Sequence, residues 1–349
     1  MSRIVLADDG IAFDGKTFEA EPLGGVESAV VCLAEALARR GHDVTVCNRC
    51  AAPLDHNGVQ WRPIHDGGAY RGVPAEADLY IANRGDRLIP LVAKARRAVF
   101  WIHNPAGYLL KWRYLSKLWR RRPAIVFIGA YHAATYPRWA PDGGRVVIPY
   151  GIPDAFATAA TAEGIPGPRA VFTSNPLRSL DWLLDIWAAS IYPHVPGAEL
   201  HIFAGASVYG SAGDAKVTQM DAVLNKARGM QEQGVAVRGP VPKDRLIEEL
   251  RAARVMLYRG DVNETFCLAL GEAQAMGVPA VVQDIGSMAE RVIDGVTGYV
   301  AKNDEAFSKA AMNLLSDDGL WRTQHESALA RQRRWRWEDA ATAFERLLP

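Results

Sequence analysis

Apolar runs of four to seven residues alternate with longer segments of helical periodicity along most of the chain. The first run, RIVLAD (3–8), is followed by a Gly24-Gly25 turn, an amphipathic segment and a second apolar run that ends near residue 48. Apolar residues recur at helical spacing in that segment, at Ala29, Cys32, Leu33, Ala36 and Leu37. We expect Gly41 to end the helix. A strand, a helix and a strand in this order predict a parallel sheet.

The alternation continues in two blocks. Further strands of the first block are expected at 77–83, 98–104, 124–130 and 145–151. A stretch rich in Ala, Thr, Gly and Pro from 152 to 168 has the composition of a linker, and the pattern resumes at 167–175. A polar helix is expected from 214 to 228. The sequence therefore predicts an α/β protein with two doubly wound domains, at 1–160 and 161–330, followed by the terminal segment 331–349.

Composition limits the class of protein. The 349 residues are enough for about two domains, and a net charge of +1 argues against a general nucleic-acid binder. The first residues enter a strand without a signal-peptide pattern, and we find no run of 18 uncharged apolar residues. Four cysteines fit a reducing cytoplasm. Cys47 and Cys50 form an isolated C-x-x-C that lacks a second ligand pair, so a redox or zinc site is not expected there.

Two glutamates mark the most informative stretch, NETFCLALGEAQAMGVPA (263–280). Seven residues separate Glu264 from Glu272. The apolar residues of this stretch have helical spacing, and Gly-Val-Pro is expected to end the helix. If the spacing is helical, the carboxylates lie about 12 Å apart along the axis. That is wider than the roughly 5–9.5 Å of two carboxylates that act on one glycosidic bond. We therefore expect the two acids to hold different parts of one elongated ligand, with a phosphate at the amide groups of the helix start.

The chain resembles the GT-B glycosyltransferases of the large retaining family 4. The resemblance depends on Glu264-x7-Glu272 and on the small residues that follow it, Ala273, Ala275, Gly277 and Pro279. It implies two Rossmann-like domains that face a cleft, and a final helix that crosses back onto the first domain. It also implies transfer of a sugar, with retention of configuration, from a nucleotide sugar to a glycan or lipid-linked acceptor. The commonest setting of such enzymes is polysaccharide or lipopolysaccharide synthesis.

The resemblance also assigns roles to residues. Glu264 is expected to hold the donor sugar, His103 to contact that sugar from the first domain, and Glu272 to accept hydrogen bonds from the ribose. The diphosphate is expected at Gly24-Gly25, at Arg178 and at the start of the helix, formed by Thr265, Phe266, Cys267 and Leu268. Arg178 stands at the position of the family lysine, whereas the family arginine position holds Thr173, and glycine is usual at the position of Cys267.

A basic segment, YLLKWRYLSKLWRRR (108–122), contains six basic residues and no acid. Tyr108, Trp112, Leu115 and Trp119 are expected on one helical face, with Lys111, Arg113 and Lys117 among the charges around it. Two interpretations stay open. Such a helix is typical of contact with anionic lipid or a lipid-linked acceptor at the inner face of the cytoplasmic membrane. Alternatively, the basic residues form a solvent-exposed face of a helix whose apolar face packs in the core.

No cofactor and no metal are expected beside the nucleotide sugar. The adjacent acids Asp8-Asp9 and Asp317-Asp318 lack a coordinating frame. Three other functions stay open: a nucleotide-sugar epimerase or sugar phosphorylase of the same fold, a non-catalytic scaffold of a membrane-associated polymer-assembly complex, and a membrane-surface binding protein. The sequence does not define the sugar, the nucleotide or the acceptor.

Overall fold

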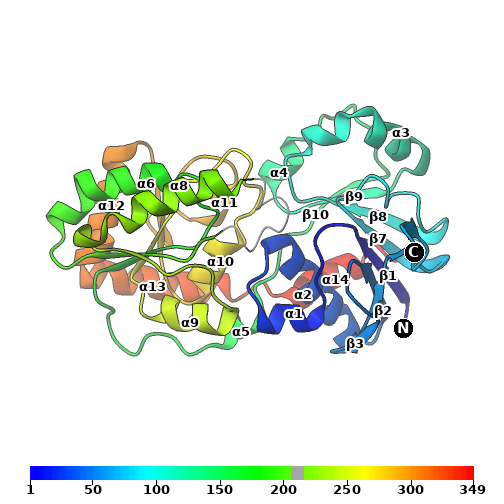
Figure 1. Ribbon diagram of the computed structural model, residues 1–349, viewed down its shortest axis with the longest axis horizontal. Coiled ribbons are helices and arrows are strands. Elements are labelled where there is room, and N and C mark those ends of the chain that lie inside the picture. Colours follow the sequence, from blue (N-terminus) through cyan, green and yellow to red (C-terminus); the bar gives the residue numbers. More distant parts are fainter. Residues whose placement is uncertain (206–215) are drawn as a thin grey trace. The chain divides into compact units, whose positions relative to one another are not determined.

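The computed structural model describes residues 1–205 and 216–349. The chain forms two compact units (Figure 1). Unit 1 contains residues 1–151 together with 336–349, and unit 2 contains residues 152–335. The division lies nearer the N-terminus than the expected boundary after residue 160, because Ile152 and Phe156 are buried in the core of unit 2.

The main sheet of unit 1 has the strand order β10-β9-β8-β7-β1-β2-β4-β3. Its pairs are parallel except for β3 with β4. The chain extends the sheet on one side of β1 and then resumes on the other side at β7, so the strand order reverses between β1 and β7. Ligands of open α/β sheets bind at the carboxyl ends of the strands beside such a reversal. The strands are β1 Arg3–Asp8, β2 Asp43–Asn48, β3 Leu54–His56, β4 Val59–Pro63, β7 Glu76–Asn83, β8 Lys94–Trp101, β9 Ala124–Phe127 and β10 Arg145–Val147, and β5 His65–Asp66 pairs with β6 Ala69–Tyr70 in a separate hairpin.

The helices of unit 1 come from both ends of the chain. The helix of the first βαβ unit, α2, begins directly after Gly24 and ends before the left-handed Gly41. The terminal helix α14 packs on α2, where Arg39 bonds Glu338 at 2.6 Å and Arg40 bonds Glu345 at 2.6 Å. The helices are α1 Gly15–Ala20, α2 Gly25–Arg39, the 3-10 helix η1 Ala106–Leu110, α3 Trp112–Arg121, α4 Ala130–Ala134 and α14 Trp337–Glu345.

Unit 2 contains a parallel sheet with the strand order β13-β12-β11-β14-β15-β16, so its order reverses between β11 and β14. Its strands are β11 Arg169–Phe172, β12 Glu199–Ile202, β13 Val235–Val237, β14 Val255–Leu257, β15 Ala280–Gln283 and β16 Gly298–Ala301. Its helices are α5 Asp154–Thr158, α6 Leu180–Ile186, the π-helix η2 Trp187–Ile191, η3 Tyr192–His194, α8 Val217–Arg228, η5 Gln231–Gln233, α9 Lys243–Arg251, α10 Leu268–Ala275, α11 Met288–Arg291, α12 Asp304–Ser316 and α13 Asp318–Gln332. The first two residues of the helix expected at 214–228 lie outside the described residues.

Each sheet is buried by apolar residues of the predicted runs, as in β1, where every residue after Arg3 is buried. The α/β class with two doubly wound parallel sheets is therefore confirmed. Within residues 1–205 and 216–349, none of the helices combines the length and the apolar character needed to cross a bilayer.

Buried His132 makes the stability of unit 1 sensitive to acid. Its Nδ1 accepts the N–H of Ile128 at 3.2 Å, its Nε2 bonds the carbonyl of Asn104 at 2.8 Å, and burial lowers its pKa to about 4. Because the unfolded chain takes up the proton near pH 6.5, stability is retained above that pH and is lost below it. At pH 5, His132 should reduce the free energy of unfolding by about 2 kcal/mol relative to pH 7. Urea unfolding at both pH values measures this loss, which His132→Asn should diminish and His194→Asn, at a more exposed site, should leave unchanged.

Candidate functional site

Arg178 and Glu264 form an ion pair beside the reversal of strand order in unit 2. Arg178 lies in the loop after β11, and Glu264 lies in the loop after β14. The two loops are also joined by the Ser179 hydroxyl, which donates to the carbonyl of Gly260 at 3.0 Å. The hydroxyl of Tyr258 donates to the carboxylate oxygen of Glu264 that Arg178 binds, at 3.2 Å. The structure thus holds a buried carboxylate and a guanidinium at the edge of the sheet where ligands bind.

The two glutamates do not share one helix, which corrects the helical spacing expected for them. The turn formed by Thr265, Phe266 and Cys267 is buried, and α10 begins only at Leu268. Cys267 has a left-handed backbone, with φ 61°, and its N–H donates to the carboxylate of Glu264 at 3.2 Å. One of the amide groups expected to be open to a phosphate is therefore occupied by Glu264.

Glu272 is the fifth of the eight residues of α10, and it is bound by a cation that the sequence did not single out. The Nζ of Lys243, the first residue of α9, lies 2.6 Å from Glu272 Oε1. Both glutamates of the motif are thus held by a cation from a different loop or helix of unit 2. Lys243 follows Pro242 at a helix start, and the sequence contains no spacing that would connect it with Glu272.

Arg291 is a third cation near the start of α10. Its guanidinium carbon lies 4.0 Å from the ring centre of Phe266, and burial lowers its pKa to about 10. Its Nε is buried and has no hydrogen-bond partner among the described residues. Gly271 provides the space, because a Cβ there would lie 2.7 Å from Arg291 Nη2. Arg291 stays protonated at neutral pH and adds a positive charge to this part of the unit.

The backbone of Gly286 supports the loop that carries Glu264. Gly286 has φ +66°, and a Cβ there would lie 2.3 Å from the carbonyl oxygen of Asp261 and 2.8 Å from that of Glu264. The next residue, Ser287, donates its N–H to the carbonyl of Glu264 at 3.0 Å. The close contact fixes the position of Glu264 relative to the loop after β15.

In unit 1, His103 belongs to a buried polar network at the carboxyl ends of β1, β7 and β8. Asp8 accepts the amide N–H of Asn83 at 2.6 Å, so the oxygen of Asn83 faces His103 and accepts its Nε2–H. The hydroxyl of Tyr150 bonds His103 Nδ1. Burial, with Arg84 and His132 nearby, lowers the pKa of His103 well below its usual value. The imidazole is neutral and already has two protein partners, and its expected contact with the donor sugar stays a prediction.

Arg84 connects this network with the first turn of α2. It has a left-handed backbone, with φ 55°, and its guanidinium bonds Asp8 at 3.1 Å and the buried Glu27 at 2.8 Å. The same turn contains the glycine pair: Gly24 is the N-cap of α2, and Gly25 is its first residue. Among the described residues, and apart from the neighbours of Gly25 and the backbone of α2, no atom lies within 4 Å of a Cβ placed on Gly25, so packing of that part of the chain does not require a glycine there.

The basic segment consists of two helices, which corrects the single face expected for it. Tyr108 belongs to η1, and its hydroxyl is buried. Trp112 is the first residue of α3 and is exposed, as is Lys111 before it. Arg113 and Lys117 both form ion pairs with Asp86, the former at 3.8 Å.

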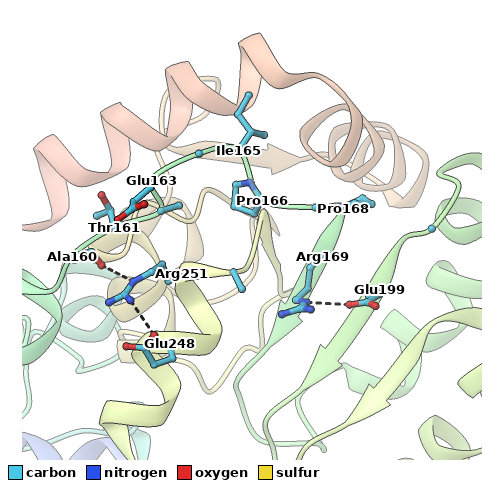
Figure 2. Close-up of a pocket in the computed structure, with 15 residues that line it drawn as sticks. Ala160, Thr161, Glu163, Ile165, Pro166, Pro168, Arg169, Glu199, Glu248 and Arg251 are labelled. Atoms are coloured by element: carbon cyan, nitrogen blue, oxygen red, sulfur yellow. Dashed lines mark hydrogen bonds and ion pairs between the residues drawn. The ribbon is translucent and has the colours of Figure 1, made fainter.

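A cavity of about 760 Å³ lies at the opposite edge of the unit 2 sheet (Figure 2). Arg169 and Glu199, the first residues of β11 and β12, line it and bond each other at 3.1 Å. Arg251 bonds Glu248 at 3.0 Å on its other side, as the dashed lines in Figure 2 show. The cavity is at the amino ends of the strands, whereas Arg178 and Glu264 follow their carboxyl ends, so it is separate from the candidate site.

Cys47 and Cys50 are free and buried. Burial raises the pKa of the Cys47 thiol to about 12, the opposite of the shift that activates redox cysteines. In the described part of the chain, no three His, Cys, Asp or Glu side chains are grouped so that they could hold a metal ion.

Comparison with protein families finds a match within unit 2. Residues 168–317, which include β11 through α12 and the whole Arg178–Glu264–Glu272 arrangement, match the family model "Glycosyl transferases group 1". This part of the chain is therefore similar to group 1 glycosyltransferases.

Curated relatives match part of the chain. A D-inositol 3-phosphate glycosyltransferase of Xylanimonas cellulosilytica is 33% identical over 130 residues, which are 37% of this chain and 30% of that protein. The enzyme of the same name from Nocardia farcinica is 29% identical over 191 residues, 54% of this chain and 41% of that protein. The chain thus spans less than half the length of these curated relatives.

Solved structures match the whole chain. Sucrose-phosphate synthase from Thermosynechococcus elongatus aligns with a TM-score of 0.72 at 18% identity and covers 99% of this chain and 97% of its own. The Anabaena protein HepE, in complex with UDP and glucose, aligns with a TM-score of 0.70 at 15% identity and covers 100% of this chain and 99% of its own. At this identity the likeness shows the fold alone, which is GT-B.

Proposed function

We propose that the chain transfers a sugar from a nucleoside-diphosphate sugar to the hydroxyl of a glycan or lipid-linked acceptor, in the synthesis of a surface polysaccharide or lipopolysaccharide. The observation that supports this proposal is the pair of motif glutamates, each bound by a cation, in the region that matches the group 1 glycosyltransferase model. Acidic side chains suit the hydroxyls of the sugar and the ribose, whereas the guanidinium of Arg178 suits a diphosphate.

The transfer replaces one bond of the anomeric carbon. The bond to the diphosphate oxygen breaks, the bond to the acceptor oxygen forms on the same face, and the acceptor proton passes to the departing phosphate oxygen. The protein must stabilise the negative charge that develops on the diphosphate. No general base from the protein is required in this scheme, which agrees with the neutral, fully hydrogen-bonded state of His103.

Each cation has a place in the proposal. The diphosphate competes with Glu264 for Arg178, and the carboxylate that is released binds the sugar hydroxyls. In the same way the ribose displaces Lys243 from Glu272. Arg291 adds positive charge near the start of α10. The resemblance implies that Thr173, after β11, holds the position of the family arginine, so Arg291 is the cation proposed to replace that arginine. In unit 1, the open space at Gly25 leaves the first turn of α2 accessible to an anion.

A thermal-shift panel of UDP, GDP, ADP and dTDP, each with and without its glucose ester, tests the proposal. A ligand at 100 times its Kd stabilises the folded chain by about 2.7 kcal/mol, which raises Tm by several degrees. UDP-glucose comes first, because the solved structure of HepE contains UDP and glucose. A second assay then measures release of the nucleoside diphosphate from the donor that binds. An increase in this release when acceptor is added supports transfer.

Other results would favour another function. Nucleotide binding without release of the diphosphate in any acceptor mixture would favour the non-catalytic scaffold. Conversion of the donor into an isomeric nucleotide sugar in the absence of acceptor would favour an epimerase. Product with inverted anomeric configuration, read from the proton–proton coupling constant of the new linkage, would contradict retention. No stabilisation by any nucleotide would contradict the proposal as a whole.

A further inference from the structure

A long segment of unit 1 is basic without a single acid. Between Asp86 and Asp142 the sequence contains eleven Lys and Arg residues and no Asp or Glu, although the whole chain has a net charge of only +1. The basic residues are Arg87, Lys94, Arg96, Arg97, Lys111, Arg113, Lys117, Arg120, Arg121, Arg122 and Arg138. Lys94 and Arg96 form ion pairs with Glu76 and Asp78, whereas six of the other basic residues lie between residues 108 and 122, in and around α3.

Three large aromatic side chains of this segment are exposed. Trp112, Trp119 and Trp139 expose 75%, 70% and 72% of their surface. Exposure of this extent is unusual for the largest apolar side chain. Trp112 and Trp119 are seven residues apart on α3, two turns of the helix, so they share one face. The residues that α3 buries in the core are Tyr114 and Leu118.

The loop that contains Trp139 adjoins the C-terminal end of α3. The N–H of Gly143 donates to the carbonyl of Pro123 at 2.9 Å, and a Cβ on Gly143 would lie 1.8 Å from the carbonyl oxygen of Arg122. The guanidinium of Arg145 binds three carbonyls of the same loop, those of residues 137, 138 and 140, at 2.8, 3.2 and 3.1 Å. Trp139 is thus exposed from an ordered loop. We refer to Trp112, Trp119 and Trp139, with Lys111 and Arg120, as the α3 surface.

The charges of the α3 surface are available to a partner. Lys111 and Arg120 are exposed and form no ion pair with any residue that the structure describes. Arg113 and Lys117, on the same helix, are instead held by Asp86. A basic residue near a bilayer that contains anionic lipid contributes about 1 kcal/mol to binding. Tryptophan favours the same interface, because its ring is apolar and its N–H needs a polar partner.

We propose that the α3 surface binds the face of a bilayer that contains anionic lipid, with the tryptophans at the depth of the headgroups and Lys111 and Arg120 at the phosphates. This inference goes beyond glycosyl transfer and does not depend on it. A single-stranded nucleic acid fits the surface less well. The two tryptophans of α3 are about 10 Å apart along the axis, against about 3.4 Å between stacked bases.

Flotation with vesicles tests the proposal. The full chain is mixed with vesicles of phosphatidylcholine alone, or with vesicles that also contain about 30% of the anionic lipid phosphatidylglycerol. We expect binding that is at least about tenfold stronger to the anionic vesicles and that falls as salt is raised. Trp112→Ser with Trp119→Ser, and separately Lys111→Glu with Arg120→Glu, should each weaken it at least about tenfold.

A matched control makes the same change of charge elsewhere. Lys302→Glu with Lys309→Glu alters two exposed lysines of unit 2 and should change vesicle binding by less than about twofold. Unchanged thermal melting of each variant excludes unfolding as the cause. The proposal is overturned if the wild-type chain does not float with anionic vesicles, or if both α3 variants float as well as the control. It is also overturned if the wild-type chain prefers polyuridylate over anionic vesicles and the α3 variants lose that binding instead.

Discussion

Glu264→Gln should lower kcat for sugar transfer by roughly 10²–10³-fold, with a smaller change in KM. The amide keeps the size of the side chain but removes the charge that attracts Arg178 and that accepts hydrogen bonds from sugar hydroxyls. The measurement is nucleoside diphosphate release at saturating donor. Arg178→Met should cause a loss of similar size, because its guanidinium is the cation proposed for the leaving diphosphate.

The two substitutions should not be additive, because the two side chains act on each other and on one ligand. We expect the double variant to lose little more than either single variant. Glu305→Gln, on the exposed first turn of α12, is the matched control and should leave kcat within about threefold. If Glu264→Gln retains the activity of that control while its melting is unchanged, Glu264 has no part in the reaction.

Gly286→Ala should reduce transfer by about 100-fold or destabilise the chain by more than about 2 kcal/mol. Two effects combine at this position. A left-handed backbone costs alanine about 1 kcal/mol, and the new Cβ would lie 2.3 Å from the carbonyl oxygen of Asp261, which is a backbone atom that cannot rotate away. The loop that carries Glu264 must therefore move. Measurement of the donor Kd and of kcat, together with urea unfolding, distinguishes loss of transfer activity from loss of stability.

Gly295→Ala provides the comparison. Gly295 also has a left-handed backbone, with φ +73°, but apart from its chain neighbours no atom that the structure describes lies within 4 Å of a Cβ placed there. It should cost about 1 kcal/mol of stability and leave the kinetics of transfer unchanged. Equal effects of the two substitutions on kcat would contradict a role of Gly286 in holding the Glu264 loop.

The sequence was sufficient for the fold class because buried parallel strands are short apolar runs. RIVLAD at 3–8 forms β1 with the expected bounds, and the runs at 77–83 and 124–130 contain most of β7 and all of β9. The strands between residues 54 and 63 were not predicted. They lie at the edge of the sheet and alternate buried with partly exposed residues too briefly for a clear period.

The site was predictable only where its residues are close in sequence. The spacing of Glu264 and Glu272 was visible, but the left-handed Cys267, which separates the Glu264 turn from α10, was not, because a cysteine rarely adopts that backbone. Lys243 precedes its partner Glu272 by 29 residues, and Arg178 precedes Glu264 by 86. Contacts over such distances are set by the order of strands in the sheet, which a local pattern does not contain.

The return of the chain to unit 1 has a consequence for its biosynthesis. Helix α14 follows all of unit 2 in the sequence, yet Phe344 packs 5.3 Å from Trp101 and Trp337 packs 5.7 Å from Tyr150, measured between ring centres. During synthesis on the ribosome, Trp101 and Tyr150 therefore lack these partners while residues 152–335 are translated. A nascent chain stalled before Arg336 would present Trp101 and Tyr150 to solvent and to chaperones, and release of the last fourteen residues, 336–349, would bury them.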